Sequence, residues 1–342
     1  MPGATGWYNA NKKPFRYVSG DNRDKMPDEV SAEWAISILK KKHDKPFYLG
    51  VGFIRPHSPL YAPKKYFDMF PLEDITLPPY LKGDLDDCAP VLRERWQWGY
   101  KKFEGLMKAG GETAWKEWVQ AYLACMAFVD DQLGEVLNAL DASEYRDNTI
   151  VILTSDNGYH VGEKDTIQKW HLWDESTRVP LYIHVPQGRA NGKNCDRPVS
   201  LIDIYPTLND LCGLPKEPNK NHSNTTLDGH SLRPLLENPE SKEWNGPSVA
   251  FMGIQDDKFS GALGEKYSPH FSIRSKRYRY TLCGNGEEEL YDHLRDPNEW
   301  TNLASNPNYS EMKVELRGIL IGMRQKTTAE PGAAINANKP HD

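Results

Sequence analysis

The sequence predicts an α/β fold with a mainly parallel sheet, because strand-like segments alternate with helix-like segments along the chain. Two of the strand-like segments, residues 46–54 and 149–154, are nearly continuous apolar runs, which is typical of parallel strands buried on both faces. Between them, residues 113–140 carry apolar side chains at the spacing of a helix that buries one face. These observations predict a buried sheet with helices between its strands.

Other segments extend the same alternation. Residues 31–42 predict a helix, since Ala32 and Leu39 fall on one apolar face. Lysines occupy the C-terminal end of this segment, where the helix dipole favours cations. Residues 179–185 predict another strand and residues 201–211 another helix.

The pattern changes after Leu236 into a smaller C-terminal part. Residues 237–247 are polar and contain Pro and Gly, as in a linker between domains. Beyond them the sequence predicts a small antiparallel sheet and one late helix. The expected strands are residues 249–253, 271–273, 277–282 and 289–291, and the expected helix is residues 312–324. We therefore divide the chain into residues 1–245 and an α+β subdomain of residues 246–342.

Composition and charge exclude several classes of protein. The 342 residues have a formal net charge of −6, which argues against a nucleic-acid partner because phosphate binding favours a basic surface. No apolar run approaches the roughly 20 residues of a membrane span, and the first residues lack the features of a signal peptide. Five cysteines without a CxxC pair argue against a disulfide framework. The one strongly basic run, residues 274–279, is expected to be a solvated strand face.

A turn with two oxygen-bearing side chains follows the predicted strand at residues 149–154. Asp156 and Asn157 precede Gly158, and open α/β sheets keep their sites at the carboxyl ends of strands. Adjacent oxygen donors on a tight turn suit a hard cation, although an ordinary Asp-Asn-Gly turn explains the same residues. Lys169 lies downstream, where it could hold an anion or be a solvated surface lysine.

A histidine follows the other long apolar run. His57 lies in the sequence RPHSP at residues 55–59, where the flanking prolines stiffen the loop. A histidine held at a strand end could donate a proton or bind an anion. The alternative is a histidine that only caps the loop.

Several short motifs occur together in one order. They read FYLGVGFIRPHSP at residues 47–59, TSDNGYHVGE at 154–163 and TRVPL at 177–181, with further agreement at 199–208 and 289–292. Each motif is modest alone, but in this order they are highly specific. The chain resembles the sulfatases, and within them the bacterial branch similar to iduronate-2-sulfatase, from about Lys25 to Leu303.

The resemblance implies a fold, an activity and a cofactor. The fold is an alkaline-phosphatase-like sandwich, in which residues 1–245 are the remaining part of the catalytic domain, incomplete at its N-terminus. The activity is hydrolysis of a sulfuric ester on a sulfated sugar or polysaccharide, and the cofactor is Ca²⁺. Full-length relatives are exported or lysosomal, so a periplasmic or extracellular location is expected.

The resemblance also implies roles for individual residues. Asp156 and Asn157 match the family's downstream pair of calcium ligands, and Lys169 matches the lysine that contacts the sulfate. His57 matches the histidine that contacts the sulfate and can protonate the leaving oxygen. A cation, a lysine and a histidine would together stabilise the charge on sulfate oxygens. Two further histidines could face the sugar or could be satisfied surface residues, His160 and His171.

The chain departs from the family in its nucleophile. Such sulfatases use a formylglycine made from a cysteine or serine in C/S-x-P-S-R, together with an aspartate pair after the first strand. We find neither in the 342 residues. The nearest imitation, CAPVLR at residues 88–93, has Val91 in place of the motif's serine, and its arginine comes one place late. We therefore expect that Cys88 is not a nucleophile, that the chain is N-terminally truncated, and that alone it is inactive.

Two alternative functions stay open. A phosphatase or phosphoryl-transfer relative of the same clan would favour histidine-rich zinc or manganese ligands, whereas Asp156 and Asn157 offer oxygens. A non-catalytic sulfatase fragment that binds sulfated glycan would also lack the nucleophile.

Overall fold

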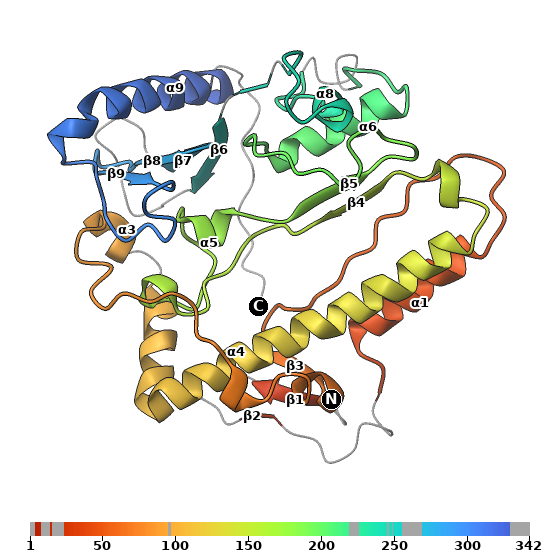
Figure 1. Cartoon of the computed structure of the whole chain (residues 1–342), viewed down its shortest axis with the longest axis horizontal. Helices are drawn as coiled ribbons and strands as arrows, with labels where there is room; N and C mark the ends of the chain where they lie inside the picture. Colours follow the sequence, from red (N-terminus) through yellow and green to blue (C-terminus); the bar gives the residue numbers. More distant parts are fainter. Residues whose placement is uncertain are drawn as a thin grey trace.

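The computed structural model of the protein has a mixed α/β architecture (Figure 1). It describes residues 4–7, 14–15, 24–94, 97–218, 226–244, 246–247, 249–254 and 269–328. Within these residues the strands form a three-stranded sheet, a two-stranded sheet and a four-stranded sheet. In Figure 1 the four-stranded sheet and helix α9 lie at the upper left, and helices α1 and α4 cross the lower half.

Helix α1 (Pro27–Leu39) packs along helix α4 (Gln97–Asp141). It begins earlier than the predicted residues 31–42, because Pro27 suits the first helical turn. The Glu29 carboxylate also accepts a hydrogen bond from the Met26 backbone N–H at 2.8 Å, which caps the helix. The predicted apolar face is buried through Ala32, Ala35 and Leu39.

Helix α4 contains the predicted helix of residues 113–140 and extends well before it. The two parts meet at Gly111, whose φ of 58° and ψ of −140° interrupt the helical geometry. Buried aromatic side chains on both sides of this break form the main core of the larger part of the molecule. They include Phe103, Trp115, Trp118 and Phe128.

A small antiparallel sheet covers part of α4. It consists of β1 (Ala4–Trp7), β2 (Pro14–Phe15) and β3 (Leu60–Pro63), in the order β2-β1-β3. The short helix α2 (Lys64–Phe67) continues from β3 and also packs on α4. The sequence did not predict this sheet, whose strands are short and separated along the chain.

Strand β4 (Val151–Thr154) confirms the strand predicted at 149–154, and β5 (Leu181–His184) confirms the one at 179–185. Their pairing is antiparallel, with Val151 opposite His184, and every strand pair in the described part of the chain is antiparallel. The α/β class is therefore confirmed, but these pairings do not show the mainly parallel sheet we predicted. Apolar runs indicate burial and not strand direction.

Residues 46–54 do not form the strand that their apolar run predicted. They are extended without a ladder, and Figure 1 shows them as a coil between the β4–β5 pair and α4. The buried Asp28 carboxylate accepts hydrogen bonds from the backbone N–H groups of Ile54 and Arg55, at 2.6 and 3.0 Å. A side chain therefore takes two backbone donors that a neighbouring strand would otherwise use.

The C-terminal sheet confirms the predicted antiparallel subdomain, in the strand order β6-β7-β8-β9. Its elements are β6 (Val249–Ile254), β7 (His270–Ser275), β8 (Tyr278–Leu282), β9 (Glu288–Asp292) and helix α9 (Ser310–Thr328). The helix packs on the sheet, and the core between them includes Ile273, Tyr280, Leu290, Leu316 and Leu320. The domain boundary near residue 245 stays a prediction.

The remaining helices are short. They are α3 (Pro90–Glu94), α5 (Asp174–Thr177), α6 (Ile204–Leu211) and α8 (Arg233–Glu237). A 3₁₀ turn at Leu201–Asp203 leads into α6, so together they confirm the helix predicted at 201–211. In the part of the chain that the structure describes, none of the helices combines the length and apolarity needed to cross a bilayer.

Candidate active-site cleft

A cleft of about 1740 Å³ is lined by β5, by the segment before it and by the edge of the C-terminal sheet. Four of the residues predicted for the site line this cleft, namely Asp156, Asn157, Lys169 and His171. Arginines from β7, from β8 and from the position directly after α5 line it as well. The cleft therefore brings carboxylate, amide and cationic side chains together.

The turn after β4 is fixed against α5. The Gly158 backbone N–H donates to the Ser176 carbonyl at 3.0 Å, and a Cβ at Gly158 would lie only 2.1 Å from the Glu175 carbonyl oxygen. Only glycine allows this approach, so Gly158 holds the turn close to α5. Asp156 is exposed and Asn157 is half-buried, and their side-chain oxygens suit a hard cation such as calcium.

Lys169 and His171 lie on the loop between the turn and α5. Lys169 is half-buried, whereas His171 is 2% exposed and stacks on Trp173 with ring centroids 4.7 Å apart. Both residues line the cleft. The sugar contact of His171 stays a prediction.

His160 does not line the cleft, although its ring centroid lies 5.9 Å from that of His171. It is 1% exposed and lines a separate small cavity of about 30 Å³ together with Lys164, Asp174 and Glu299. Burial lowers the pKa of His160 to about 3, so its ring is neutral at pH 7. This placement favours a structural role over the sugar contact that we predicted.

His57 is exposed on a loop of its own. Its Nδ1 lies 2.7 Å from the Ser58 carbonyl oxygen, and its own carbonyl oxygen accepts a hydrogen bond from buried Arg55 at 2.7 Å. Among the described residues, His57 is not one of those that line the cleft. The structure therefore brings the predicted metal pair and Lys169 together without His57.

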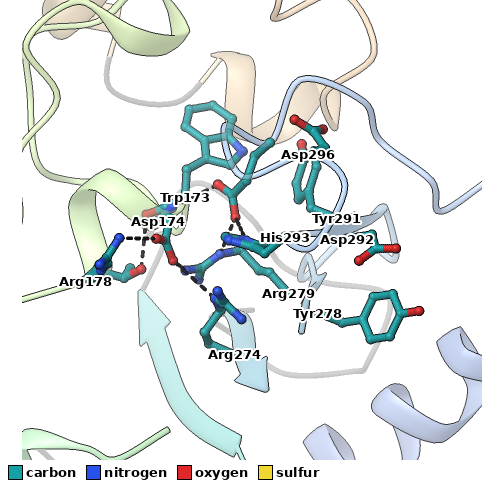
Figure 2. A network of polar contacts seen from close by, with 12 residues as sticks. Trp173, Asp174, Arg178, Arg274, Tyr278, Arg279, Tyr291, Asp292, His293 and Asp296 are labelled. Atoms are coloured by element: carbon teal, nitrogen blue, oxygen red, sulfur yellow. Dashed lines mark hydrogen bonds and ion pairs between the residues drawn. The ribbon is translucent and has the colours of Figure 1, made fainter. Parts of the chain in front are cut away.

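An ion-pair network contributes residues to the wall of the cleft (Figure 2). Fully buried Arg279 binds the Asp174 carboxylate, and its Nε lies 2.5 Å from Glu299 Oε1. His293 Nε2 also lies 2.8 Å from Glu299 Oε1. Burial alone would raise the pKa of Glu299, but Arg279 and His293 lower it to about 2. The expectation that residues 274–279 form a solvated face is therefore wrong at Arg279.

Three residues of the same network lie close enough together to be considered as metal ligands. Ligand atoms of Asp174, His293 and Glu299 lie within 4.8 Å of one another, as metal ligands can. The Arg279 guanidinium already occupies both carboxylates, and a second cation there would be repelled. These residues fit a structural ion-pair network better than a metal centre.

Cys88 is buried in the C-terminal part of the molecule. It is 3% exposed, and its Sγ lies 3.5 Å from the Asp84 carbonyl oxygen and 3.7 Å from the Tyr291 hydroxyl. Burial raises the pKa of the Cys88 thiol well above its ordinary value. A neutral, enclosed thiol agrees with our expectation that Cys88 is not the nucleophile.

Comparison with family models identifies the family of the chain. The family model described as Sulfatase matches residues 2–214. The chain belongs to the sulfatase family. A second model, described as the C-terminal part of N-sulphoglucosamine sulphohydrolase, matches residues 162–326 of this sulfatase.

Curated relatives agree with this family. The sulfatase is 37% identical over 300 residues to a "Sulfatase" of Formosa agariphila, covering 86% of this chain and 53% of that protein. It is 30% identical over 320 residues to iduronate 2-sulfatase of Mus musculus, covering 75% of this chain and 55% of that protein. The chain thus spans about half the length of the curated relatives it matches.

Solved structures support the alkaline-phosphatase-like fold. Phosphonate monoester hydrolase of Agrobacterium radiobacter is 25% identical with a TM-score of 0.70, covering 94% of this chain and 64% of that chain. A structure solved with its substrate D-glucosamine-2-N,6-O-disulfate is 22% identical with a TM-score of 0.68, covering 94% of this sulfatase and 73% of that chain. The predicted fold class is therefore confirmed.

Proposed function

We propose that this sulfatase site hydrolyses a sulfuric ester on a sulfated carbohydrate. The observation that carries the proposal is the convergence of Asp156, Asn157 and Lys169 on one large cleft. Family membership and the relatives named for sulfated sugars support the same chemistry. By the same family likeness we propose a periplasmic or extracellular location.

We assign Asp156 and Asn157 to a calcium ion. A carboxylate and an amide oxygen, adjacent and accessible from the cleft, match the oxygen ligands that calcium prefers. When bound, such an ion would offset negative charge on the sulfate oxygens. The Lys169 ammonium would bind a sulfate oxygen and hold the ester in place.

The leaving-group proton is assigned to His57 on the family likeness alone. An imidazole can donate a proton to an ester oxygen near neutral pH. The 342 residues contain no C/S-x-P-S-R motif to supply the aldehyde nucleophile. We therefore expect these residues by themselves to bind a sulfate ester without turnover.

A second candidate is hydrolysis of a phosphonate or phosphate ester. Its support is the structural likeness to phosphonate monoester hydrolases, with TM-scores of 0.70 and 0.71. A non-catalytic, glycan-binding role is the third possibility, because the sequence lacks the nucleophile motif.

The test is calorimetric titration of the chain, in millimolar calcium, with D-glucosamine 6-O-sulfate and with phenylphosphonate. We expect the sulfate ester to bind more tightly, and Lys169→Ala to weaken it about tenfold or more, because a charge-assisted hydrogen bond contributes about 1.5–3 kcal/mol. Lys193→Ala, an exposed lysine lining the same cleft, is the matched control and should have little effect. Tighter phosphonate binding would favour the second candidate, and equal effects of the two lysines would contradict the assignment of Lys169.

A further inference from the structure

Glu289 connects the C-terminal sheet to two segments that are distant in sequence. It lies on β9 and is 0% exposed, and each of its carboxylate oxygens accepts a hydrogen bond from a different segment. The Ala89 backbone N–H, directly before α3, donates to Oε1 at 2.8 Å. The Trp173 indole N–H donates to Oε2 at 2.9 Å. Ala89 and Trp173 are 200 and 116 residues from Glu289, so one buried carboxylate holds three parts of the chain together.

Trp173 belongs to the segment that forms part of the cleft wall. It is 1% exposed, and the residues on either side of it line the cleft. His171 stacks on Trp173 with an interplanar angle of 23°, and the His171 backbone N–H donates to the Lys169 carbonyl oxygen at 2.9 Å. Among the described residues, Glu289 is not one of those that line the cleft. It therefore acts through Trp173 and His171 on the wall that carries Lys169.

The negative charge of Glu289 is poorly compensated by the groups that face it. The cation among them is Lys164, whose ammonium already binds Asp84 and the Glu299 carbonyl oxygen. The Glu299 carboxylate adds a second negative charge. Burial raises the pKa of the thiol and phenol groups around Glu289, so they are neutral at pH 7. These groups are Cys88, Tyr100, Cys283 and Tyr291. A buried carboxylate in such surroundings holds its proton more tightly than a carboxylate in water.

Gaining a proton changes what the Glu289 carboxyl can accept. Burial raises its pKa to about 7, against the Ala89 hydrogen bond, the Lys164 charge and the Trp173 hydrogen bond. As a carboxylate it accepts both N–H groups, whereas a protonated oxygen becomes a donor and keeps less capacity to accept. Hydrogen bonds to the charged form are also about twice as strong. Protonation near neutral pH therefore weakens the contact of Glu289 with these two N–H groups.

We propose that Glu289 is a positioning residue for the cleft wall. In this role the carboxylate holds Trp173 and, through it, the segment of Lys169, and its protonation loosens both. The inference rests on the proposed function, because it takes Lys169 as the group that binds the sulfate ester. A sulfate ester keeps its charge between pH 6 and pH 8, so the affinity for it should decrease as the pH falls through about 7. Protonation of histidines at the cleft would have the opposite effect, since it adds positive charge.

Fluorine NMR of the chain with 5-fluorotryptophan incorporated tests the contact directly. Trp173→Phe identifies the Trp173 resonance, which we expect to move between pH 6 and pH 8 with a midpoint of about 7. In Glu289→Gln, which keeps the size of the side chain, this titration should be lost. Glu175→Gln is the matched control and should keep it, because burial and neighbouring carboxylates raise the pKa of Glu175 to about 7 as well. A Trp173 resonance that does not move, or that moves equally in Glu289→Gln, would overturn the proposal.

Calorimetry with D-glucosamine 6-O-sulfate in millimolar calcium measures the effect on the cleft. We expect the wild-type chain to bind about threefold or more tightly at pH 8 than at pH 6, on the order of one lost hydrogen bond. Glu289→Gln and Trp173→Phe should bring this ratio close to one, with melting temperatures measured to check folding. Equal affinity of wild type at the two pH values would overturn the inference, whereas loss of binding in Lys169→Ala would leave the proposed function standing. If the sugar binds at neither pH, both proposals fail.

Discussion

Arg279 shows how a single residue can hold two parts of this molecule together. Its side chain is 1% exposed and is paired with the carboxylates of Asp174 and Glu299, which are 125 residues apart in the sequence. We expect Arg279→Met to lower the free energy of unfolding by about 3–5 kcal/mol, because it leaves two buried carboxylates without their cation. Urea denaturation of the purified variant measures this change.

Arg317→Met serves as the comparison for Arg279. Arg317 is 42% exposed and its Nη1 lies 3.0 Å from Glu288 Oε1. Because water screens an exposed pair, its loss should cost less than about 1 kcal/mol. Equal losses for the two variants would contradict a special role for the buried network.

The burial of His160 is expected to make the free energy of unfolding depend on pH. Burial lowers its pKa from 6.5 to about 3, so between these values the unfolded chain binds more protons than the folded chain. Its contribution is complete above about pH 6.5 and is lost as pH falls toward 3. For His160→Gln we expect the decrease in unfolding free energy between pH 7 and pH 5 to be smaller than in wild type by about 2 kcal/mol. Urea denaturation of both proteins at the two pH values measures this difference. An equal decrease in unfolding free energy for wild type and His160→Gln would contradict the prediction.

At the residue scale, the sequence could predict some residues that line the cleft and not others. Asp156 and Asn157 were accessible to prediction because they directly follow an apolar strand. Arg279 was not, since a basic residue in an alternating strand is normally exposed. Its burial depends on Asp174 and Glu299, which are distant in sequence and reach it only through the folded backbone.

At the element scale, α4 depends on one glycine. Gly111 has a φ of 58°, where any other residue is strained, and it separates the segment carrying Phe103 from the predicted helix at 113–140. Alanine at this position should cost about 1–2 kcal/mol. Thermal unfolding followed by circular dichroism measures the effect.

A second glycine in α4 gives the opposite expectation. Gly134 lies within the helix, and a Cβ added there meets nothing within 4 Å. Gly134→Ala should therefore stabilise the protein by about 0.5–1 kcal/mol, through lower backbone entropy in the unfolded chain. The same sign of change for Gly111→Ala and Gly134→Ala would show that the break at Gly111 is not required.

Elements with their own periodicity were predicted well. The C-terminal strands and α9 were found within a few residues of their bounds, since alternation and helical spacing are local signals. The segment at 46–54 failed because a short apolar run does not reveal its pairing partner. In the structure Tyr48 is 83% exposed, and Asp28 holds the end of the segment. Strand formation needs a partner backbone, which composition cannot supply.

At the scale of the whole molecule, contacts between segments distant in sequence connect the parts of the chain that line the cleft. The buried Lys164 ammonium lies 2.7 Å from Asp84 Oδ1 and also binds the Glu299 carbonyl oxygen. The Asn302 backbone N–H donates to the Asp87 carboxylate at 2.7 Å. The Lys164 contact connects the segment that carries Lys169 to the C-terminal part, and the Asn302 contact connects the loop around Asp87 to it. The cleft therefore depends on both parts predicted from the sequence, although their boundary shows only as a change in composition.

Calcium should stabilise this chain only slightly. In the described part of the cleft we assign two protein ligands, Asp156 and Asn157, whereas calcium prefers about six to eight oxygens. With water filling the other positions, we expect a dissociation constant on the order of 1 mM, so 1 mM calcium adds about 0.4 kcal/mol to the free energy of unfolding. Thermal melts with and without calcium, with Asp156→Asn as the comparison, measure this contribution. Stabilisation of about 3 kcal/mol or more, lost in the variant, would mean that the residues described here already form a complete calcium site.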